Sequence, residues 1–215
     1  MAEERIFIQS DGLKIEALID ESPGQEAVVA THPHPLYGGD MYNNVVQSMI
    51  SAYKQTGFTT LRFNFRGVGR SEGKHGQGIG EQEDVRSALA FLSEMGKASI
   101  DLAGYSFGSW VNALGLASFD LVKRAVMVSP PVAFVDFSFL GYSPKIKLVI
   151  SASEDNIAPP AIIKDMLPKW NPEAELKVIQ GIDHFYGGGT SEVASTIKAF
   201  LEKKATKARG REGKI

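Results

Sequence analysis

Short apolar runs alternate with amphipathic segments along almost the whole chain. Residues 4–9 and 13–19 alternate in type around Ser10-Asp11-Gly12, a pattern that predicts an antiparallel hairpin. Continuous apolar runs follow, as is typical of strands that are covered on both faces of a parallel sheet. These further predicted strands are residues 26–31, 58–65, 99–103, 121–129, 145–152 and 174–179.

Segments with helical periodicity fill most of the intervals between these runs. Asn43 or Asn44 can cap a helix that stops at Gly57, and residues 81–95 carry apolar positions at helical spacing up to Gly96. The other predicted helices follow the 99–103 strand to about residue 117, run from Pro159 or Pro160 to near Pro168, and span residues 190–203. This order predicts an α/β fold with a mostly parallel sheet of about eight strands and helices on both faces.

The interval at residues 130–144 differs from the others, because it is short and rich in proline and holds no convincing helix. We therefore expect a single domain, residues 1–203, with no lid domain inserted into it. Residues 204–215 are predicted to form a basic, flexible tail.

Charge and composition exclude several classes of function. Residues 203–215 contain six Lys or Arg and one Glu, so residues 1–202 hold 17 basic and 24 acidic side chains, a net charge of −7. An acidic body argues against a nucleic-acid partner. The absence of cysteine excludes disulfides, thiolate metal sites and cysteine nucleophiles. With no signal-peptide pattern and no apolar run near the roughly 18 residues of a membrane span, we expect a cytoplasmic protein without a membrane partner.

The sequence Gly104-Tyr105-Ser106-Phe107-Gly108 lies between a predicted strand and a predicted helix. Strand, Gly-x-Ser-x-Gly and helix together predict a nucleophile elbow, a strained turn that presents the hydroxyl of Ser106. A side chain at either glycine would collide with the neighbouring strand and helix. The pattern also arises by chance, so it needs a base, an acid and an oxyanion site elsewhere in the chain.

Two strand ends supply a base and an acid for Ser106. His184 follows the last predicted strand, and Asp155 follows the strand before it. The carboxyl ends of parallel strands share one edge of a sheet, where ligands bind in open α/β folds. Glu154 is an immediate rival for the acid and Asp136 a weaker one. The order Ser106, Asp155, His184 is the order that accompanies a nucleophile elbow.

Backbone N–H groups are needed to bind a developing oxyanion. Phe107 offers one at the start of a helix, where the helix dipole adds to it. A second should come from residues 32–39, in which the two prolines cannot donate. His34, Leu36 and Tyr37 remain, and Leu36 is the donor that we predict.

The other histidines do not predict a metal site. His32 and His34 form a His-x-His pair, but no third ligand is evident nearby, so we expect structural rings, no metal and no cofactor. Residues 66–73 form a glycine-rich loop without the features of a dinucleotide fingerprint, and we expect them to pack as a loop. His75 is expected to be solvated.

Three stretches of the sequence resemble the α/β-hydrolase family, and the likeness extends over about residues 4–203. They are His-Pro-His-Pro-Leu-Tyr-Gly-Gly at 32–39, Phe-Asn-Phe-Arg-Gly-Val-Gly-Arg-Ser-Glu-Gly at 63–73 and Gly-Tyr-Ser-Phe-Gly at 104–108. They look like the small bacterial dienelactone-hydrolase-like branch of predicted carboxylesterases. The resemblance implies Ser106 as nucleophile, Asp155 as acid and His184 as base. Serine rather than cysteine at the elbow puts dienelactone itself in doubt as a substrate.

These observations predict a serine hydrolase that cleaves carboxylic esters, with short acyl chains, through an acyl-enzyme on Ser106. Many members of the family carry a helical lid where this chain has only residues 130–144, so an open site is expected, with Tyr37 and Phe134 binding the substrate. A thioesterase or a small amide or peptide hydrolase with the same residues is the alternative, and a binding protein without activity is a third. We expect a small-molecule ester as partner and a monomer or homodimer.

Overall fold

The structure, a computed structural model, describes residues 3–212, and it describes side chains up to Lys203. Eight strands form one sheet in the order β1-β2-β4-β3-β5-β6-β7-β8. The strands are β1 (Glu4–Ser10), β2 (Leu13–Asp20), β3 (Glu26–Thr31), β4 (Thr59–Phe63), β5 (Ser99–Tyr105), β6 (Val122–Val128), β7 (Ile146–Ala152) and β8 (Glu175–Ile179). The helices are α1 (Asn44–Gln55), α2 (Ile79–Glu94), α3 (Phe107–Gly115), α4 (Pro160–Trp170), α5 (Thr190–Glu212) and the 3₁₀ turn η1 (Pro35–Tyr37).

The sheet confirms the predicted fold class. β2 pairs antiparallel with both β1 and β4, and all the remaining pairs are parallel. From the central β3 the chain goes first to β4 on one side and then to β5 on the other. Such a reversal of strand order opens a crevice at the carboxyl edge, because the two connecting loops diverge there.

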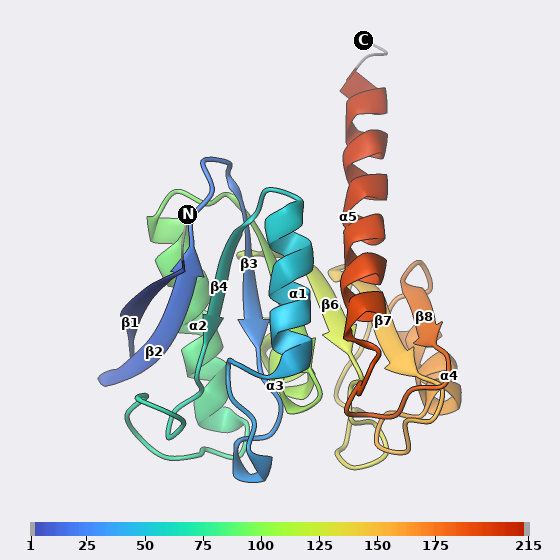
Figure 1. Cartoon of the computed structure of the whole chain (residues 1–215), viewed down its shortest axis with the longest axis horizontal. Coiled ribbons are helices and arrows are strands. Elements are labelled where there is room, and N and C mark those ends of the chain that lie inside the picture. Colours follow the sequence, from blue (N-terminus) through green and yellow to red (C-terminus); the bar gives the residue numbers. More distant parts are fainter. Residues whose placement is uncertain (1–2, 213–215) are drawn as a thin grey trace.

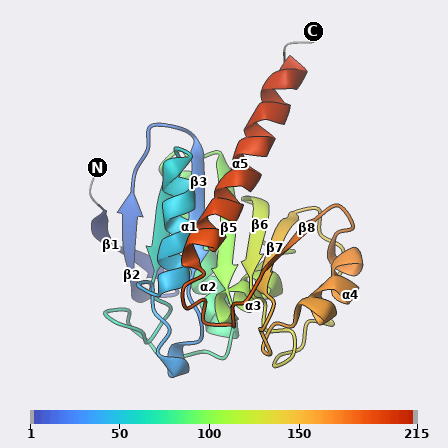
Figure 2. The ribbon, with the colours of Figure 1, turned by 45° about the vertical axis from the view of Figure 1, so that its right-hand side comes forward.

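Helices cover both faces of the sheet, and the alternation of side chains along β3 shows how. Ala27 and Val29 belong to the core beneath α2, α3 and α4, whereas Val28 and Ala30 belong to the core beneath α1 and α5. Figures 1 and 2 show α1 and α5 side by side on one face, with α2 and α3 on the other. Both faces of the central strands are thus buried, which explains their continuous apolar runs.

The C-terminal helix is longer than predicted. α5 was expected to end at residue 203, but its backbone continues to Glu212, and Figure 1 shows its last turns extending past the sheet. Part of the predicted tail is therefore helical, while its flexibility stays a prediction and residues 213–215 lie outside the described part. No helix within residues 3–212 combines the length and the apolar character needed to cross a membrane.

Residues 130–144 form only turns and irregular backbone, so no lid is inserted between β6 and β7. A smaller correction concerns α4, which continues beyond Pro168 to Trp170. The Trp170 side chain is almost fully buried and packs against Phe137 of the 130–144 segment, with ring centroids 5.5 Å apart. This packing holds the last turn in place although the proline cannot donate a hydrogen bond to it.

Candidate active site

Ser106 lies in the turn between β5 and α3 with φ of +51° and ψ of −118°. Residues other than glycine rarely adopt this backbone conformation. The two flanking glycines permit this turn for steric reasons. A Cβ at Gly104 would lie 2.7 Å from the Ser109 nitrogen in α3, and one at Gly108 would lie 2.6 Å from Thr31 Oγ1 in β3. The turn therefore has the geometry that the Gly-x-Ser-x-Gly pattern predicted.

The structure brings Ser106, His184 and Asp155 together at the carboxyl edge. His184 Nε2 lies 2.9 Å from Ser106 Oγ, and His184 Nδ1 lies 2.9 and 3.0 Å from the two carboxylate oxygens of Asp155. A carboxylate can only accept, so Nδ1 carries the ring hydrogen and Nε2 accepts the Ser106 hydroxyl proton. All three side chains are buried. The imidazole is thus oriented to take a proton from the serine.

Asp155 is kept ionised by its surroundings. Burial alone would raise the pKa of its carboxyl, but the hydrogen bond and charge of His184 and further donors outweigh that effect and lower the pKa. The further donors are the N–H groups of Ile157 at 2.9 Å and Ala158 at 2.7 Å, and the Ser129 hydroxyl at 2.7 Å. The carboxylate can therefore stabilise a positive charge on the ring of His184.

Ser129 and Tyr186 extend this line of hydrogen bonds, and neither was predicted from the sequence. Ser129 Oγ donates to Asp155 Oδ2 and also lies 2.7 Å from the Tyr186 hydroxyl, which must be the donor of that second bond. Both residues are fully buried and both have positive φ, +44° and +56°. One feature of the sequence could have indicated Ser129. It is the last residue of the predicted strand 121–129, and Asp155 follows the next predicted strand, 145–152.

Tyr105 is a third residue of the site that was not predicted from the sequence. Its hydroxyl donates to the backbone oxygen of His184 at 2.7 Å, and the two ring centroids are 5.5 Å apart. Burial raises the pKa of the Tyr105 phenol, so it remains a donor. The residue before the elbow serine thereby fixes the loop that carries the histidine.

The rivals for the acid do not reach His184. The Glu154 side chain is exposed and its backbone N–H donates to Ile182 O. The Asp136 carboxylate is also exposed and accepts hydrogen bonds from the backbone and hydroxyl of Ser138. Of the open alternatives, only Asp155 contacts the imidazole.

The predicted donor at Leu36 is wrong. Its N–H donates to His34 Nδ1 at 3.2 Å as part of the cap of η1, and Leu36 does not line the pocket at Ser106. The N–H of Tyr37 donates to His34 O. Within the described residues, the N–H of His34 has no hydrogen-bond partner, and neither has that of Phe107, and both residues line the pocket.

His32 has a structural place in the same loop, as expected. Its Nδ1 donates to Pro33 O at 2.7 Å, and its Nε2 accepts the Phe65 N–H at 3.0 Å, so the ring joins the ends of β3 and β4. Complete burial lowers the pKa of His32 to about 4, which keeps the ring neutral. Among residues 3–212 with described side chains, no group of three or more His, Asp or Glu is arranged to hold a metal.

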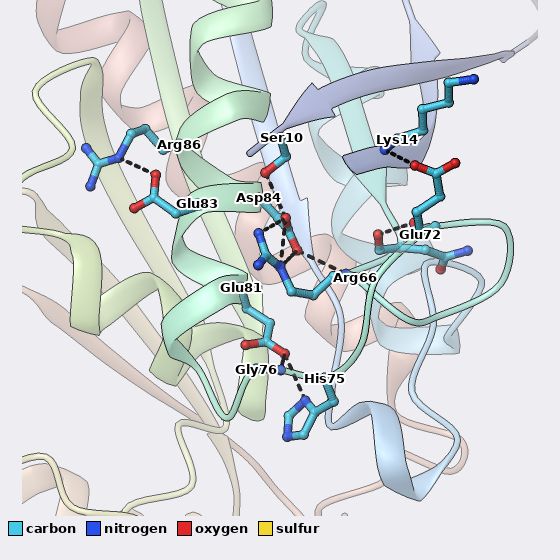
Figure 3. A network of polar contacts seen from close by, with 12 residues as sticks. Ser10, Lys14, Arg66, Glu72, His75, Gly76, Glu81, Glu83, Asp84 and Arg86 are labelled. Atoms are coloured by element: carbon cyan, nitrogen blue, oxygen red, sulfur yellow. Dashed lines mark hydrogen bonds and ion pairs between the residues drawn. The ribbon is translucent and has the colours of Figure 1, made fainter. Parts of the chain in front are cut away.

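The glycine-rich loop beside the site is tied to α2 by the polar contacts that Figure 3 shows. The Arg66 guanidinium lies 2.9 Å from the buried Asp84 carboxylate, and Glu81 accepts the Gly76 N–H at 2.8 Å. The expectation that His75 is solvated is wrong, since its Nδ1 lies 2.8 Å from buried Glu81 Oε1, off the alignment of a good hydrogen bond. These contacts hold residues 66–76 against α2, in agreement with the predicted packing role of the loop.

A pocket of about 400 Å³ opens directly over Ser106. Tyr37 and Phe134, the two predicted substrate-binding residues, both line it. Its other apolar walls include Pro131, Val135, Ile157 and Phe185. The arrangement therefore combines a hydroxyl poised for deprotonation, two free N–H groups and an apolar cavity.

Comparisons with known proteins agree with the fold. A relative from Rickettsia prowazekii, described as an uncharacterized protein, is 33% identical over 190 residues, which are 84% of this chain and 80% of the relative. The structure of an α/β serine hydrolase homologue from Coxiella burnetii matches with a TM-score of 0.86 and 32% identity over 94% of this chain and 98% of its own. An α/β serine hydrolase without a lid from Xanthomonas campestris matches with a TM-score of 0.85 and 25% identity over 94% of each chain. No protein-family model matches the sequence.

Proposed function

Because the chain belongs to the α/β serine hydrolase family, we propose that it hydrolyses carboxylic esters through an acyl-enzyme on Ser106. The observation that carries this proposal is the unbroken line of hydrogen bonds from Ser106 Oγ through His184 to Asp155 at the floor of an apolar pocket. Neither hydroxyl nor imidazole is reactive enough alone, but the pair generates a nucleophile at neutral pH.

In the first half of the proposed reaction, His184 Nε2 takes the hydroxyl proton while Ser106 Oγ attacks the ester carbonyl carbon. The negative charge on the carbonyl oxygen is held by the N–H groups of Phe107 and His34, and the start of α3 adds its dipole. Asp155 stabilises the charged imidazole. His184 then protonates the leaving alcohol oxygen, and the carbon–oxygen bond breaks to leave the acyl group on the serine.

In the second half, His184 takes a proton from a water molecule, which attacks the acyl carbon. The same two N–H groups hold the second tetrahedral intermediate. The proton returns from His184 to Ser106 Oγ as the carboxylic acid departs, so the enzyme returns to its starting state. Because no lid covers the pocket, water and short acyl esters can reach the serine directly, and we propose that Tyr37 and Phe134 bind them.

The proposal is tested with purified protein, p-nitrophenyl acetate and butyrate, and a fluorophosphonate probe. We expect turnover of both esters and covalent labelling of Ser106, and Ser106→Ala should lower kcat on the order of 10⁵–10⁶-fold and abolish labelling. Full activity in Ser106→Ala, or no turnover of either ester by the unaltered chain, would contradict it. Matched thioester and anilide substrates measured alongside separate an esterase from a thioesterase or amidase.

A further inference from the structure

The pocket over Ser106 is lined by apolar and uncharged polar groups together with two histidines, His34 and His184. Among the described residues that line it there is no Lys, Arg, Asp or Glu. The titratable His34 is neutral, because burial and, second, the neighbouring His75 lower its pKa. A substrate that carried a carboxylate into this cavity would lose water without gaining a cationic partner.

Three exposed aromatic side chains surround the mouth of this pocket. Tyr37, Phe134 and Phe185 are 88%, 70% and 67% exposed, and they lie on the loops after β3, β6 and β8. Large apolar groups gathered at the rim of a cavity mark a surface that a ligand covers. Aromatic rings gain most from flat, apolar partners, which they can contact face to face or edge to face.

The cationic groups near the site lie elsewhere. Arg66 and Lys74 line a separate hollow of about 460 Å³, which shares only Gly38 and Gly39 with the pocket over Ser106, and Arg66 is already paired with Asp84. Residues 1–202 have a net charge of −7, so the long-range field also disfavours an anion. The uncharged lining of the pocket and the net negative charge of the protein therefore both disfavour an anionic substrate.

We propose that this site selects uncharged esters with an apolar acyl or alcohol group and discriminates against esters that carry a carboxylate. The inference rests on the proposed ester hydrolysis and names its substrate class. The rim of Tyr37, Phe134 and Phe185 contacts the apolar group. The uncompensated desolvation of a carboxylate lowers kcat/KM by roughly tenfold or more relative to a neutral substrate of the same shape.

The test compares p-nitrophenyl hexanoate with mono-p-nitrophenyl adipate. The two esters share a leaving group and differ by the exchange of a terminal methyl for a carboxylate, and the six-carbon chain keeps that carboxylate from attacking its own ester. We expect kcat/KM to be more than tenfold higher for the hexanoate. Phe134→Arg or Phe185→Arg should raise the adipate-to-hexanoate ratio by about tenfold, because either places a cation at the rim.

Tyr142→Arg is the matched control. Tyr142 is 67% exposed and lies, like Phe134, in the 130–144 segment, but it does not line the pocket. The Tyr142→Arg variant should leave the ratio unchanged. Equal rates on the two esters, or a ratio that neither rim variant raises, would overturn this inference while leaving ester hydrolysis intact. Turnover of neither ester, with no fluorophosphonate labelling of Ser106, would overturn the proposed function and this inference with it.

Discussion

The Asp155 carboxylate depends on two residues in backbone conformations that cost energy. Ser129 and Tyr186 both have positive φ without being glycine, a feature that costs about 1–3 kcal/mol per residue and persists where the surroundings determine it. Their hydroxyls form a directed chain, from Tyr186 to Ser129 to Asp155 Oδ2. Two residues in strained backbone conformations thus supply the hydroxyl groups that keep the Asp155 carboxylate ionised and oriented.

Ser129→Ala removes one donor from the charged form of Asp155, so the pKa of that carboxyl should rise. The sign follows because hydrogen bonds to the ionised form lower the pKa of an acid, and this one is lowered in the folded protein. The loss of this donor also leaves the carboxylate less firmly oriented against the His184 ring. We expect kcat/KM to fall roughly tenfold at pH 7.

Ser138→Ala provides the control for this prediction. Ser138 Oγ also donates to an aspartate, Asp136, at 2.7 Å, but on the exposed surface away from His184. Its removal should leave kcat/KM unchanged. Tyr186→Phe should show a smaller loss of kcat/KM than Ser129→Ala. An unchanged kcat/KM in Ser129→Ala would show that the hydroxyl does not support the carboxylate.

At the scale of elements, the site depends on how closely α3 approaches β3. Gly108 is the point of contact, where an added Cβ would lie 2.6 Å from Thr31 Oγ1 and 2.7 Å from the His32 backbone oxygen. The His32 oxygen belongs to the backbone and cannot rotate away, so the helix or the strand must shift. Such a shift would move the elbow serine and the 32–39 loop apart, and with them the two proposed oxyanion donors.

Gly108→Ala should therefore destabilise the fold by about 1–3 kcal/mol and lower kcat by more than its effect on stability alone would explain. Urea unfolding and ester kinetics measure the two effects separately. Gly141→Ala is the matched substitution, because a Cβ at Gly141 meets no atom within 4 Å and no positive φ is required there. If both alanine variants behave alike, close packing at the elbow is not what constrains this position.

At the scale of the whole molecule, the first part of α5 packs on the core that it shares with α1, and its last turns extend past the sheet. The side chains that anchor it are Val193, Ile197, Phe200 and Leu201, all buried. Residues 204–214 offer no apolar side chain larger than alanine. The stability of the body should therefore be independent of the part of the helix that extends past the sheet.

A chain that ends at Lys203 should keep its free energy of unfolding within about 0.5 kcal/mol and its kcat/KM within roughly twofold. A chain that ends at Ala199 loses Phe200 and Leu201 and should be destabilised by at least about 3 kcal/mol. Thermal and urea unfolding of the two truncated proteins measure the difference. A large loss on removing only residues 204–215 would show that the last turns contact the body.

Local patterns were sufficient for most elements and for three of the site residues. Apolar runs and helix caps depend on neighbours a few residues away, so the eight strands and the elbow could be predicted. Ser106, Asp155 and His184 could be proposed together because parallel strands align their carboxyl ends at one edge. The end of α5 could not be predicted, because no breaker such as glycine or proline follows Lys203 until Gly210.

The sequence by itself determined the order of strands and helices, the short connection in place of a lid, and the residue types at the strand ends. Only the tertiary structure decided which N–H groups of the 32–39 loop are free. The His34 ring packs against Phe107 and His75, and in that position it accepts the Leu36 N–H that was expected to bind the oxyanion. The tertiary structure also decided that Ser129 and Tyr186 support Asp155. Hydrogen bonds between residues 26 and 57 positions apart follow from packing, which no local pattern encodes.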